Sequence, residues 1–259
     1  MSIEVSKLSF SYGDHLIFDD ISFTAYDNQL LSIIGSNGAG KSTMFRCMLG
    51  LLNGYKGKVL FNGTDIKGLS AKEMAKLVAY IPQSHYPSFN FSVFDMVLMG
   101  TTTQVSSIAS PREKQIKLAL AALERMGIEH LKNRGYTNIS GGERQLVLIA
   151  RALVQEAKVL IMDEPTANLD FGNQVRVMSE IKSLTRDGYT IIQSTHNPEQ
   201  AFQFSDAVLA LKDGKILASG APTEIFTEPL IQTLYGIDVE MQTLYGGKVK
   251  VCIPKCIIS

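Results

Sequence analysis

The sequence has few cysteines, no net charge and no long apolar run. Cys47, Cys252 and Cys256 are too few for a disulfide framework, and one Cys-x-x-x-Cys pair supplies only half of a zinc site. A reducing cytosol is therefore expected. Lys plus Arg total 25 and Asp plus Glu total 25, so no overall field attracts nucleic acid or an anionic membrane, and partners must be recognised locally.

Membrane-directed segments are also missing from the sequence. Residues 1–5 lack the basic and apolar regions of a signal peptide, and no apolar run approaches the roughly 18 residues that a membrane span needs. If the protein works at a membrane, we expect another chain to span it. With 259 residues, 45% of them hydrophobic, the chain can bury the core of one large domain or of a core with a subdomain.

The first part of the chain predicts strands, then a glycine-rich loop and a helix. Short apolar runs over residues 3–35 are separated by turn residues, which indicates strands of a sheet. A helix is predicted over residues 42–52 from the spacing of its apolar residues, and Asn53-Gly54 ends it. The result is a strand-loop-helix unit.

The middle of the chain reads as helical. Amphipathic helices are predicted over residues 111–126 and 142–154. Continuous apolar runs at residues 159–162 and 189–192 then predict buried parallel strands, because strands covered on both faces lose the alternation of polar and apolar residues. A helix near residues 173–184 separates them, and a short β-like tail is expected after residue 236.

The glycine-rich loop matches the pattern of a phosphate-binding loop. It reads Gly35-Ser36-Asn37-Gly38-Ala39-Gly40-Lys41-Ser42. Small residues let backbone amides close around phosphate oxygens at a helix N-terminus. Lys41 would reach the β- and γ-phosphates, and the Ser42 hydroxyl would ligate Mg²⁺. A glycine turn before an ordinary helix is the alternative, and the strand-loop-helix context favours the phosphate loop.

Two carboxylates come directly after the apolar run at residues 159–162. Asp163 would hold the Mg²⁺ shell, and Glu164 would polarise the attacking water as general base. A solvated acidic turn before Pro165 is the alternative. The phosphate loop upstream favours the catalytic interpretation, because such a loop requires acidic partners.

A helix start is predicted at Ile139-Ser140-Gly141-Gly142-Glu143. Ser140 and Glu143 have the spacing of a capping box, and the two glycines leave the first amides open to a close anion. A simple helix cap is the alternative interpretation of the same residues.

Together these motifs resemble the ordered set found in nucleotide-binding subunits of ABC transporters. The set comprises residues 35–42, 140–143, 160–166, Asn168-Leu169-Asp170 and Ser194-Thr195-His196, and the similarity covers about residues 3–220. The resemblance implies one ABC ATPase domain of the α/β class over residues 1–259, a P-loop NTPase core with an antiparallel β subdomain and an inserted α-helical subdomain. The expected boundaries are about 1–83 and 157–220 for the core, 84–156 for the helical subdomain and 221–259 for a C-terminal extension.

The resemblance also implies roles for single residues. The expected nucleotide-binding residues are Tyr12, which stacks on adenine, and Gly35, Ser36, Asn37, Gly38, Ala39, Gly40, Lys41, Ser42 and Thr43. The expected catalytic residues are Gln83, Glu164 and His196, and the expected Mg²⁺ ligands are Ser42, Gln83 and Asp163. The signature Ser140, Gly141, Gly142 and Glu143 would act across a dimer, and Asp170 would couple its two sites. Each of three residues also has a simpler interpretation when viewed singly. Tyr12 could be an aromatic that packs within a strand, Gln83 a loop residue, and His196 a hydrogen-bonded histidine at a strand end.

Two motif positions depart from the usual pattern. Ile139 stands where the signature usually has leucine, and Asn197 stands where aspartate often comes after the histidine. Neither change alters a group expected at the phosphates, so the sequence predicts an active ATPase.

The remaining features resemble the motors of importers for iron chelates, cobalamin and molybdate. This resemblance rests on residues 91–100 and on the tail at 235–254, although Thr101 stands where such motors commonly have arginine. Phe89, Phe91, Phe94 and Met99 are expected either to face a permease helix or to belong to the subdomain core.

The resemblance implies ATP and Mg²⁺ as cofactors and several partners. These are a second copy of the chain, integral-membrane permease subunits and an extracytoplasmic substrate-binding protein, with no nucleic acid. The expected location is the cytoplasmic face of the inner membrane. The alternatives are a non-transport ABC ATPase that acts on nucleic acid or the ribosome, and a small-molecule kinase, which would leave residues 140–143 unexplained.

Overall fold

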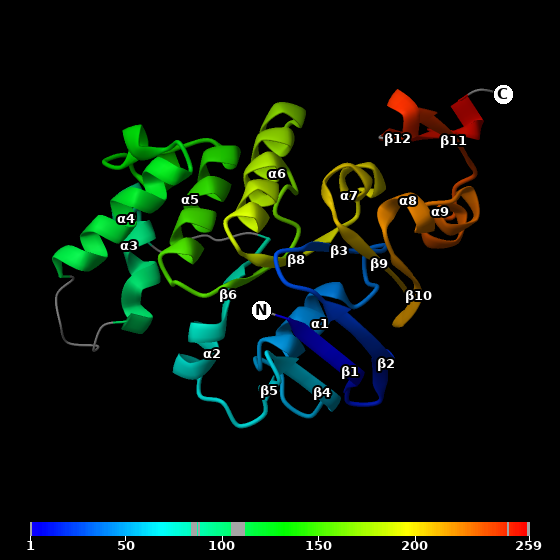
Figure 1. Ribbon diagram of the computed structural model, residues 1–259, viewed down its shortest axis with the longest axis horizontal. Coiled ribbons are helices and arrows are strands. Elements are labelled where there is room, and N and C mark those ends of the chain that lie inside the picture. Colours follow the sequence, from blue (N-terminus) through cyan, green and yellow to red (C-terminus); the bar gives the residue numbers. More distant parts are fainter. Residues whose placement is uncertain (1, 84–86, 88, 105–111, 248, 258–259) are drawn as a thin grey trace. The chain divides into compact units, whose positions relative to one another are not determined.

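The computed structural model divides into two compact units (Figure 1). It describes residues 2–83, 87, 89–104, 112–247 and 249–257. The first unit joins residues 1–68 to residues 185–259, and the second unit consists of residues 69–184. The two ends of the chain therefore fold together, and the middle of the chain forms a body of its own.

The first unit begins with an antiparallel sheet of strand order β2-β1-β4-β5. Its strands are β1 (Ile3–Tyr12), β2 (His15–Ala25), β4 (Lys56–Phe61) and β5 (Thr64–Asp65). Ile3, Val5 and Leu8 are buried, with exposed residues between them, as expected where one face of a sheet is solvated. Lys7 has φ 50° and the pairing of β1 is irregular there. The expected antiparallel β subdomain is confirmed.

A mostly parallel sheet forms the centre of the first unit. Its strands within this unit are β3 (Leu30–Ile34), β8 (Thr190–Thr195), β9 (Ala207–Lys212) and β10 (Lys215–Gly220). Strand β3 pairs in parallel with β8 on one side and β9 on the other, and β10 pairs antiparallel with β9. Every residue of β3 and β8 is buried, so the buried parallel strand predicted over residues 189–192 is confirmed as β8, which runs three residues past the predicted end. The strand predicted over residues 159–162 is confirmed in the second unit by β7 (Val159–Met162), which is also buried throughout.

Two helices come after the central strands of the first unit. Helix α1 (Lys41–Met48) comes after β3, and helix α7 (Pro198–Phe204) comes after β8. Helix α1 confirms the predicted strand-loop-helix unit, although it ends four residues before Leu52. A turn at Gly50, with φ 67°, comes after the helix end.

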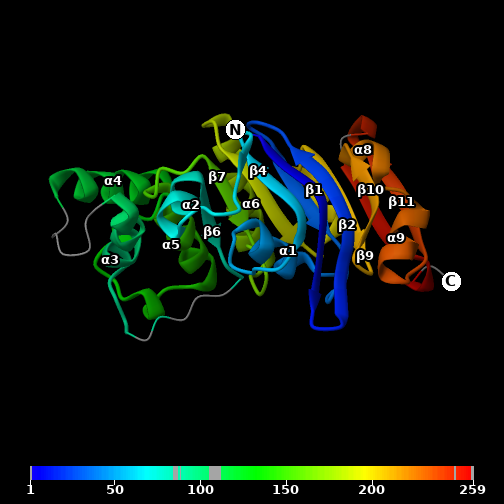
Figure 2. The same ribbon diagram turned by 90° about the horizontal axis from the view of Figure 1, so that it is seen from below.

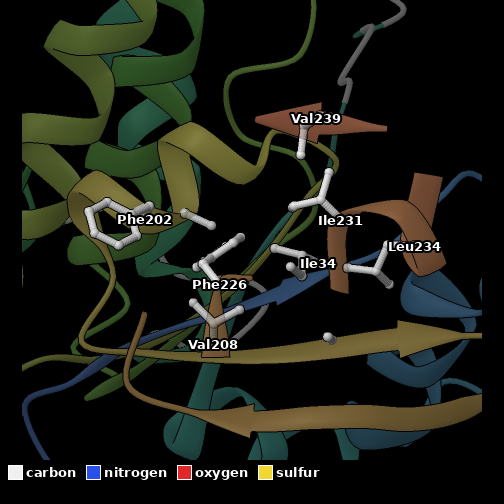
Figure 3. Packing of buried hydrophobic residues seen from close by; sticks show 9 residues of the cluster. Ile34, Phe202, Val208, Phe226, Ile231, Leu234 and Val239 are labelled. Atoms are coloured by element: carbon white, nitrogen blue, oxygen red, sulfur yellow. The ribbon is translucent and has the colours of Figure 1, made fainter. Parts of the chain in front are cut away.

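The C-terminal segment packs against α7 and the central sheet. It contains α8 (Pro222–Ile225), α9 (Glu228–Tyr235), β11 (Val239–Leu244), η4 (Tyr245–Gly247), β12 (Val249–Pro254) and η5 (Lys255–Ile257). Figure 3 shows Phe202 of α7 and Phe226 beside Ile231 and Val239, and the two phenylalanine rings lie 5.9 Å apart at 73°. The β-like tail is confirmed as the β11-β12 hairpin, and it shares the hydrophobic core of the first unit.

The second unit carries a parallel strand pair and a group of helices. Its elements are α2 (Ala71–Leu77), β6 (Val78–Ile81), α3 (Val93–Leu98), η1 (Met99–Gln104), α4 (Glu113–Arg125), η2 (Glu129–Leu131), η3 (Tyr136–Asn138), α5 (Gly141–Leu153), β7 (Val159–Met162) and α6 (Phe171–Arg186). Figure 2 shows α3, α4 and α5 grouped together, and each packs on the other two. The predicted helices over 111–126, 142–154 and 173–184 are confirmed, except that Pro111 lies outside the described residues. The boundaries predicted for the helical subdomain remain a prediction.

A close backbone contact fixes α3 and η1 against α5. A Cβ atom at Gly100 would lie 2.1 Å from the carbonyl oxygen of Arg151. No side chain fits in that space, so the segment after α3 lies directly on α5. Thr101, which replaces the arginine common in the resembling motors, is buried and its hydroxyl donates to the carbonyl of Leu98 at 2.8 Å.

Candidate functional site

The glycine-rich loop lies between β3 and the N-terminus of α1 in the first unit (Figure 1). Gly38 and Gly40 have φ of 82° and 95°, a region that favours glycine, and a Cβ at Gly35 would lie 2.2 Å from the Leu211 carbonyl oxygen. Gly40 caps α1 without any side-chain hydrogen bond. The amides of the first turn have no acceptor within the helix, so the loop offers backbone donors to an anion.

Lys41 adds a positive charge at the same loop. The side chain is 5% exposed, and its ammonium donates to the carbonyl oxygens of Gly35 at 2.8 Å and Ser36 at 3.1 Å. It therefore lies along the loop and not in open solvent. The adjacent Ser42 is exposed at the start of α1. Backbone donors, a cation and a hydroxyl at one helix start suit a chain of phosphates with a bound divalent cation.

Tyr12 lies at the end of β1 with its ring half exposed. Its ring meets that of Phe10 edge-on at 4.9 Å, and Phe10 in turn lies 6.2 Å from Phe18. A Cβ at Gly40 would lie 3.4 Å from Phe18. A row of aromatic rings therefore connects Tyr12 to the glycine-rich loop within the first unit.

His196 is exposed in the short connection between β8 and α7. The connection is held by hydrogen bonds on both sides. Asn197 Oδ1 accepts from the amide of Gln200 at 3.0 Å and so caps α7, and Thr195 Oγ1 accepts from the amide of Asn197 at 3.1 Å. An amide oxygen serves this cap as a carboxylate would, which explains how asparagine can replace the usual aspartate here.

The two acids after β7 lie in the second unit. Asp163 is buried, and its amide donates to the Ile81 carbonyl on the neighbouring strand β6 at 2.9 Å. Glu164 has φ 45°, a backbone conformation that is uncommon outside glycine. Gln83 Nε2 donates to Glu164 Oε2 at 3.1 Å. The structure therefore brings Gln83 and Glu164, which are 81 residues apart in sequence, into direct contact.

Helix α5 begins with the predicted capping box. The Ser140 amide donates to Glu143 Oε2 at 2.7 Å, and the Glu143 amide donates to Ser140 Oγ at 3.3 Å. The hydrogen bond from the Ser140 backbone is the main cause that lowers the pKa of Glu143. The capping interpretation is confirmed, while an anion-binding role for the same residues stays a prediction.

The start of α5 packs directly on the segment that contains Asp170. A Cβ at Gly142 would lie 2.3 Å from Asn173 Oδ1, and one at Gly141 would lie 3.1 Å from Leu169. The Asp170 carboxylate accepts from the Asn173 amide at 2.9 Å and from its side chain at 2.6 Å, which lowers the Asp170 pKa. Gly142 is thus required for packing, and the signature and Asp170 form one surface in the second unit.

Sequence reasoning missed a hollow in the second unit and the residue that supports it. The hollow has a volume of about 280 Å³ and lies between the end of β6, η1 and α5. Gln155 lines it and donates to the carbonyl oxygens of Ala75 and Val78 at 2.5 and 2.9 Å. A single glutamine at the end of an amphipathic helix carries no signal of such a role.

Four apolar residues after Gln83 were expected either to face a permease helix or to belong to the subdomain core. Phe89 is 71% exposed, whereas Phe91, Phe94 and Met99 are only partly buried.

These elements define a phosphate-loop nucleotide-binding protein. The family model described as "ABC transporter" matches residues 18–167. An uncharacterised ABC transporter ATP-binding protein of Haemophilus influenzae is 40% identical over 241 residues, or 93% of this chain and 92% of that protein. A protein of Helicobacter pylori assigned to iron chelatin transport is 40% identical over 242 residues, 93% and 95% of the two chains.

A solved structure agrees with the sequence relatives. It shows an inward-facing ABC transporter assigned to the metal-chelate type, and its chain superposes with a TM-score of 0.87 at 30% identity, covering 99% of this chain and 98% of the other. The chain therefore belongs to the ABC transporter family. It is an ATP-binding ABC ATPase with the P-loop NTPase fold, as the motifs predicted. Among the described residues, no helix is long and apolar enough to cross a membrane.

Proposed function

We propose that this chain hydrolyses ATP to drive an importer for a metal chelate, cobalamin or an oxyanion. The observation that carries ATP use is the glycine-rich loop, where left-handed glycines, an uncapped helix start and Lys41 meet. The importer assignment rests on relatives named for iron-chelate or cobalamin transport, whereas the oxyanion is proposed only from the resemblance of residues 91–100 and 235–254 to importer motors. These relatives include an iron(3+)-hydroxamate import protein of Bacillus subtilis, 30% identical over 97% of this chain.

The nucleotide is proposed to bind first through the first unit. Tyr12 presents a half-exposed ring for stacking on adenine, residues 35–43 surround the phosphates, and His196 contacts the γ-phosphate. The proposed Mg²⁺ ligands are Ser42, Gln83 and Asp163, which provide a hydroxyl, an amide and a carboxylate oxygen. Oxygen donors of this kind fit a hard cation, which would supply charge neutralisation at the phosphates.

Glu164 is the proposed general base. Its carboxylate is held by the Gln83 amide at 3.1 Å, and its left-handed backbone turns the residue out of the line of β7. A carboxylate fixed in this way can orient a water molecule and accept its proton. Because Gln83 contacts Glu164, a movement of the chain segment after Gln83 would change the position of the general base.

Two copies of the chain are proposed to act together, head to tail. The start of α5, from Ser140 to Glu143, would cover the γ-phosphate held by Lys41 of a second copy. The amides of Gly141 and Gly142 lack an intrahelical acceptor, as at any helix start, and Asp170 lies on the same surface. The surface that seats ATP in one copy would therefore be completed by the other.

A permease is the proposed membrane partner, with a substrate-binding protein on its outer side. Phe89 is strongly exposed, and the hollow beside η1 and α5 borders the end of β6, directly before Gln83. An apolar helix of the permease seated there would contact the strand that leads to Gln83. The chain would then lie at the cytoplasmic face of the inner membrane.

Isolation of the chain with its permease tests this function. We expect ATP-dependent uptake of a chelated metal, cobalamin or an oxyanion in vesicles that contain the complex, and no stimulation of hydrolysis by DNA or RNA. Hydrolysis stimulated by nucleic acid, without a co-purifying permease, would instead support the non-transport alternative.

A further inference from the structure

A buried chain of polar side chains links β3 to β8 and α7 in the first unit. Gln193 on β8 and Ser32 on β3 are both completely buried. Gln193 Nε2 donates to Ser32 Oγ at 2.9 Å, and Ser32 Oγ lies 2.6 Å from Ser205 Oγ at the C-terminal end of α7. In the part of the chain that the structure describes, Gln193 Oε1 has no hydrogen-bond partner.

This polar chain is not explained by packing. Ile191 and Ile192 precede Gln193 on the same buried strand, and an apolar side chain at position 193 would avoid the desolvation of an amide. The unpartnered Oε1 atom makes the amide still less favourable. A role beyond stability therefore has to account for the residue.

The two strands need something other than hydrophobicity to set their register. In a sheet with one solvated face, a slip of one residue exposes the apolar side chains, and this fixes the pairing. Both β3 and β8 are buried along their whole length, so a slip would cost little burial. Ser32 and Gln193 are direct partners in the pairing, and buried polar pairs are best known for fixing register.

The register of β3 and β8 sets the relative position of two functional residues. Ile34 and Thr195 form the last pair, and the next residues are Gly35 of the phosphate loop and His196. A slip of one residue would displace His196 along the strand by about 3.3 Å relative to that loop. Ser205 extends the same restraint to α7, whose first turn is held by Asn197, so both sides of His196 are tied to β3.

We propose that Ser32 and Gln193 are positioning residues that lock the register of β3 and β8 and so hold His196 opposite the phosphate loop. The inference rests on the proposed role of His196 at the γ-phosphate. It assigns no chemical step to Ser32 or Gln193, which act only through the placement of His196.

The test compares Ser32→Ala, Gln193→Met and the double variant in the full chain. Ser32→Ala leaves the buried Gln193 amide without its acceptor, so the melting temperature should fall. Gln193→Met leaves Ser32 its contact with Ser205 and should lower the melting temperature less. The double change removes both completely buried polar groups and leaves only the partly buried Ser205 hydroxyl, so the melting temperature should recover relative to Ser32→Ala. The rate should not recover: we expect kcat to stay on the order of tenfold low in all three, with the KM for ATP changed by less than about twofold.

A purely structural role predicts a different pattern. In that case kcat of the folded double variant would return together with its melting temperature, and this result would overturn the inference. Ile192→Val is the matched control, because it removes buried volume from the same strand without breaking a polar contact. It should lower the melting temperature and leave kcat unchanged.

A second measurement separates this inference from the proposed role of His196. In a His196→Ala background the double variant should cause no further loss of kcat, because both changes act through one residue. If His196→Ala alone leaves kcat unchanged, the proposed role of His196 fails. If His196→Ala lowers kcat but the double variant still adds its full effect, the positioning inference alone fails.

Discussion

The starts of helices α1 and α5 are both rich in glycine, yet they are completed in different ways. Helix α1 is capped by Gly40 with no side-chain hydrogen bond, and its first turn contains no acidic residue. Helix α5 is capped by its own residues, because Ser140 and Glu143 satisfy each other's amides and Glu143 places a carboxylate in the first turn. The start of α1 instead has the Lys41 ammonium beside it.

This difference assigns unequal tasks to the two helix starts. An uncapped start with a cation can bind phosphates unaided, because the ligand supplies the missing acceptors. A start that is already capped and carries a negative charge attracts an anion only weakly. We infer that α5 contributes to nucleotide binding only when a second copy already holds the phosphates, which agrees with the proposed head-to-tail dimer.

The largest expected effect comes from Lys41→Ala, which removes the cation that distinguishes α1 from α5. Hydrolysis should fall by at least about 10²- to 10³-fold, because charge that develops on the phosphates loses its stabilisation. Arg46→Ala is the matched control, since Arg46 is an exposed cation in the last turn of the same helix. Steady-state ATPase assays of both variants test this prediction. Normal turnover in Lys41→Ala would refute the assignment of residues 35–42 as the phosphate-binding loop.

Much of this comparison was predictable from the sequence, because it depends on local patterns. Residues 35–42 and 139–143 each reveal a helix start through glycine spacing and a capping pair. The contact of Gln83 with Glu164 and the packing of Gly142 on Asn173 were not predictable, since they depend on how β6, β7, α5 and α6 pack. Strand β10 was also missed, because its residues are only partly buried in alternation at an edge.

The second effect tests whether α5 needs a phosphate held by another copy. Glu164→Gln should keep ATP bound but lower the hydrolysis rate on the order of 10²- to 10⁴-fold, because the general base is lost. The variant should accumulate as an ATP-bound dimer in size-exclusion chromatography or light scattering, measured together with the permease where the free subunits associate weakly.

Ser140→Arg in the Glu164→Gln background sharpens this result. A bulky side chain at the exposed start of α5 should prevent the dimer, while each monomer still binds ATP through its intact phosphate loop. Equal dimer formation in both variants would show that α5 does not meet the nucleotide of a second copy.

A smaller effect is expected at Phe89, which lies in the segment after the catalytic residue Gln83. Phe89→Glu should uncouple hydrolysis from the permease and leave the basal rate of the chain intact, because Phe89 is exposed and its ring contacts Phe91 at 6.0 Å. Ile116→Glu on α4 is the control, as Ile116 is also exposed on the second unit. Loss of folding in Phe89→Glu, seen by circular dichroism, would favour the core interpretation of this phenylalanine instead.

The smallest expected effect comes from Glu143→Gln, which removes the charge that sets α5 apart from α1. The pKa of Glu143 is lowered in the folded chain, chiefly by the Ser140 backbone hydrogen bond. A lowered pKa contributes stability that is complete above the unfolded value of about 4.3 and is lost as pH falls through the folded pKa. Glutamine keeps an acceptor but no charge, so the loss at pH 7 should not exceed about 1 kcal/mol at this partly exposed position. Urea denaturation at pH 7 should therefore separate the two proteins, and the difference should shrink steadily as the pH is taken below the folded pKa. If the difference in unfolding free energy is the same at pH 7 and below the folded pKa, the cap stabilises α5 through its geometry alone. The carboxylate charge would then not distinguish the two helix starts.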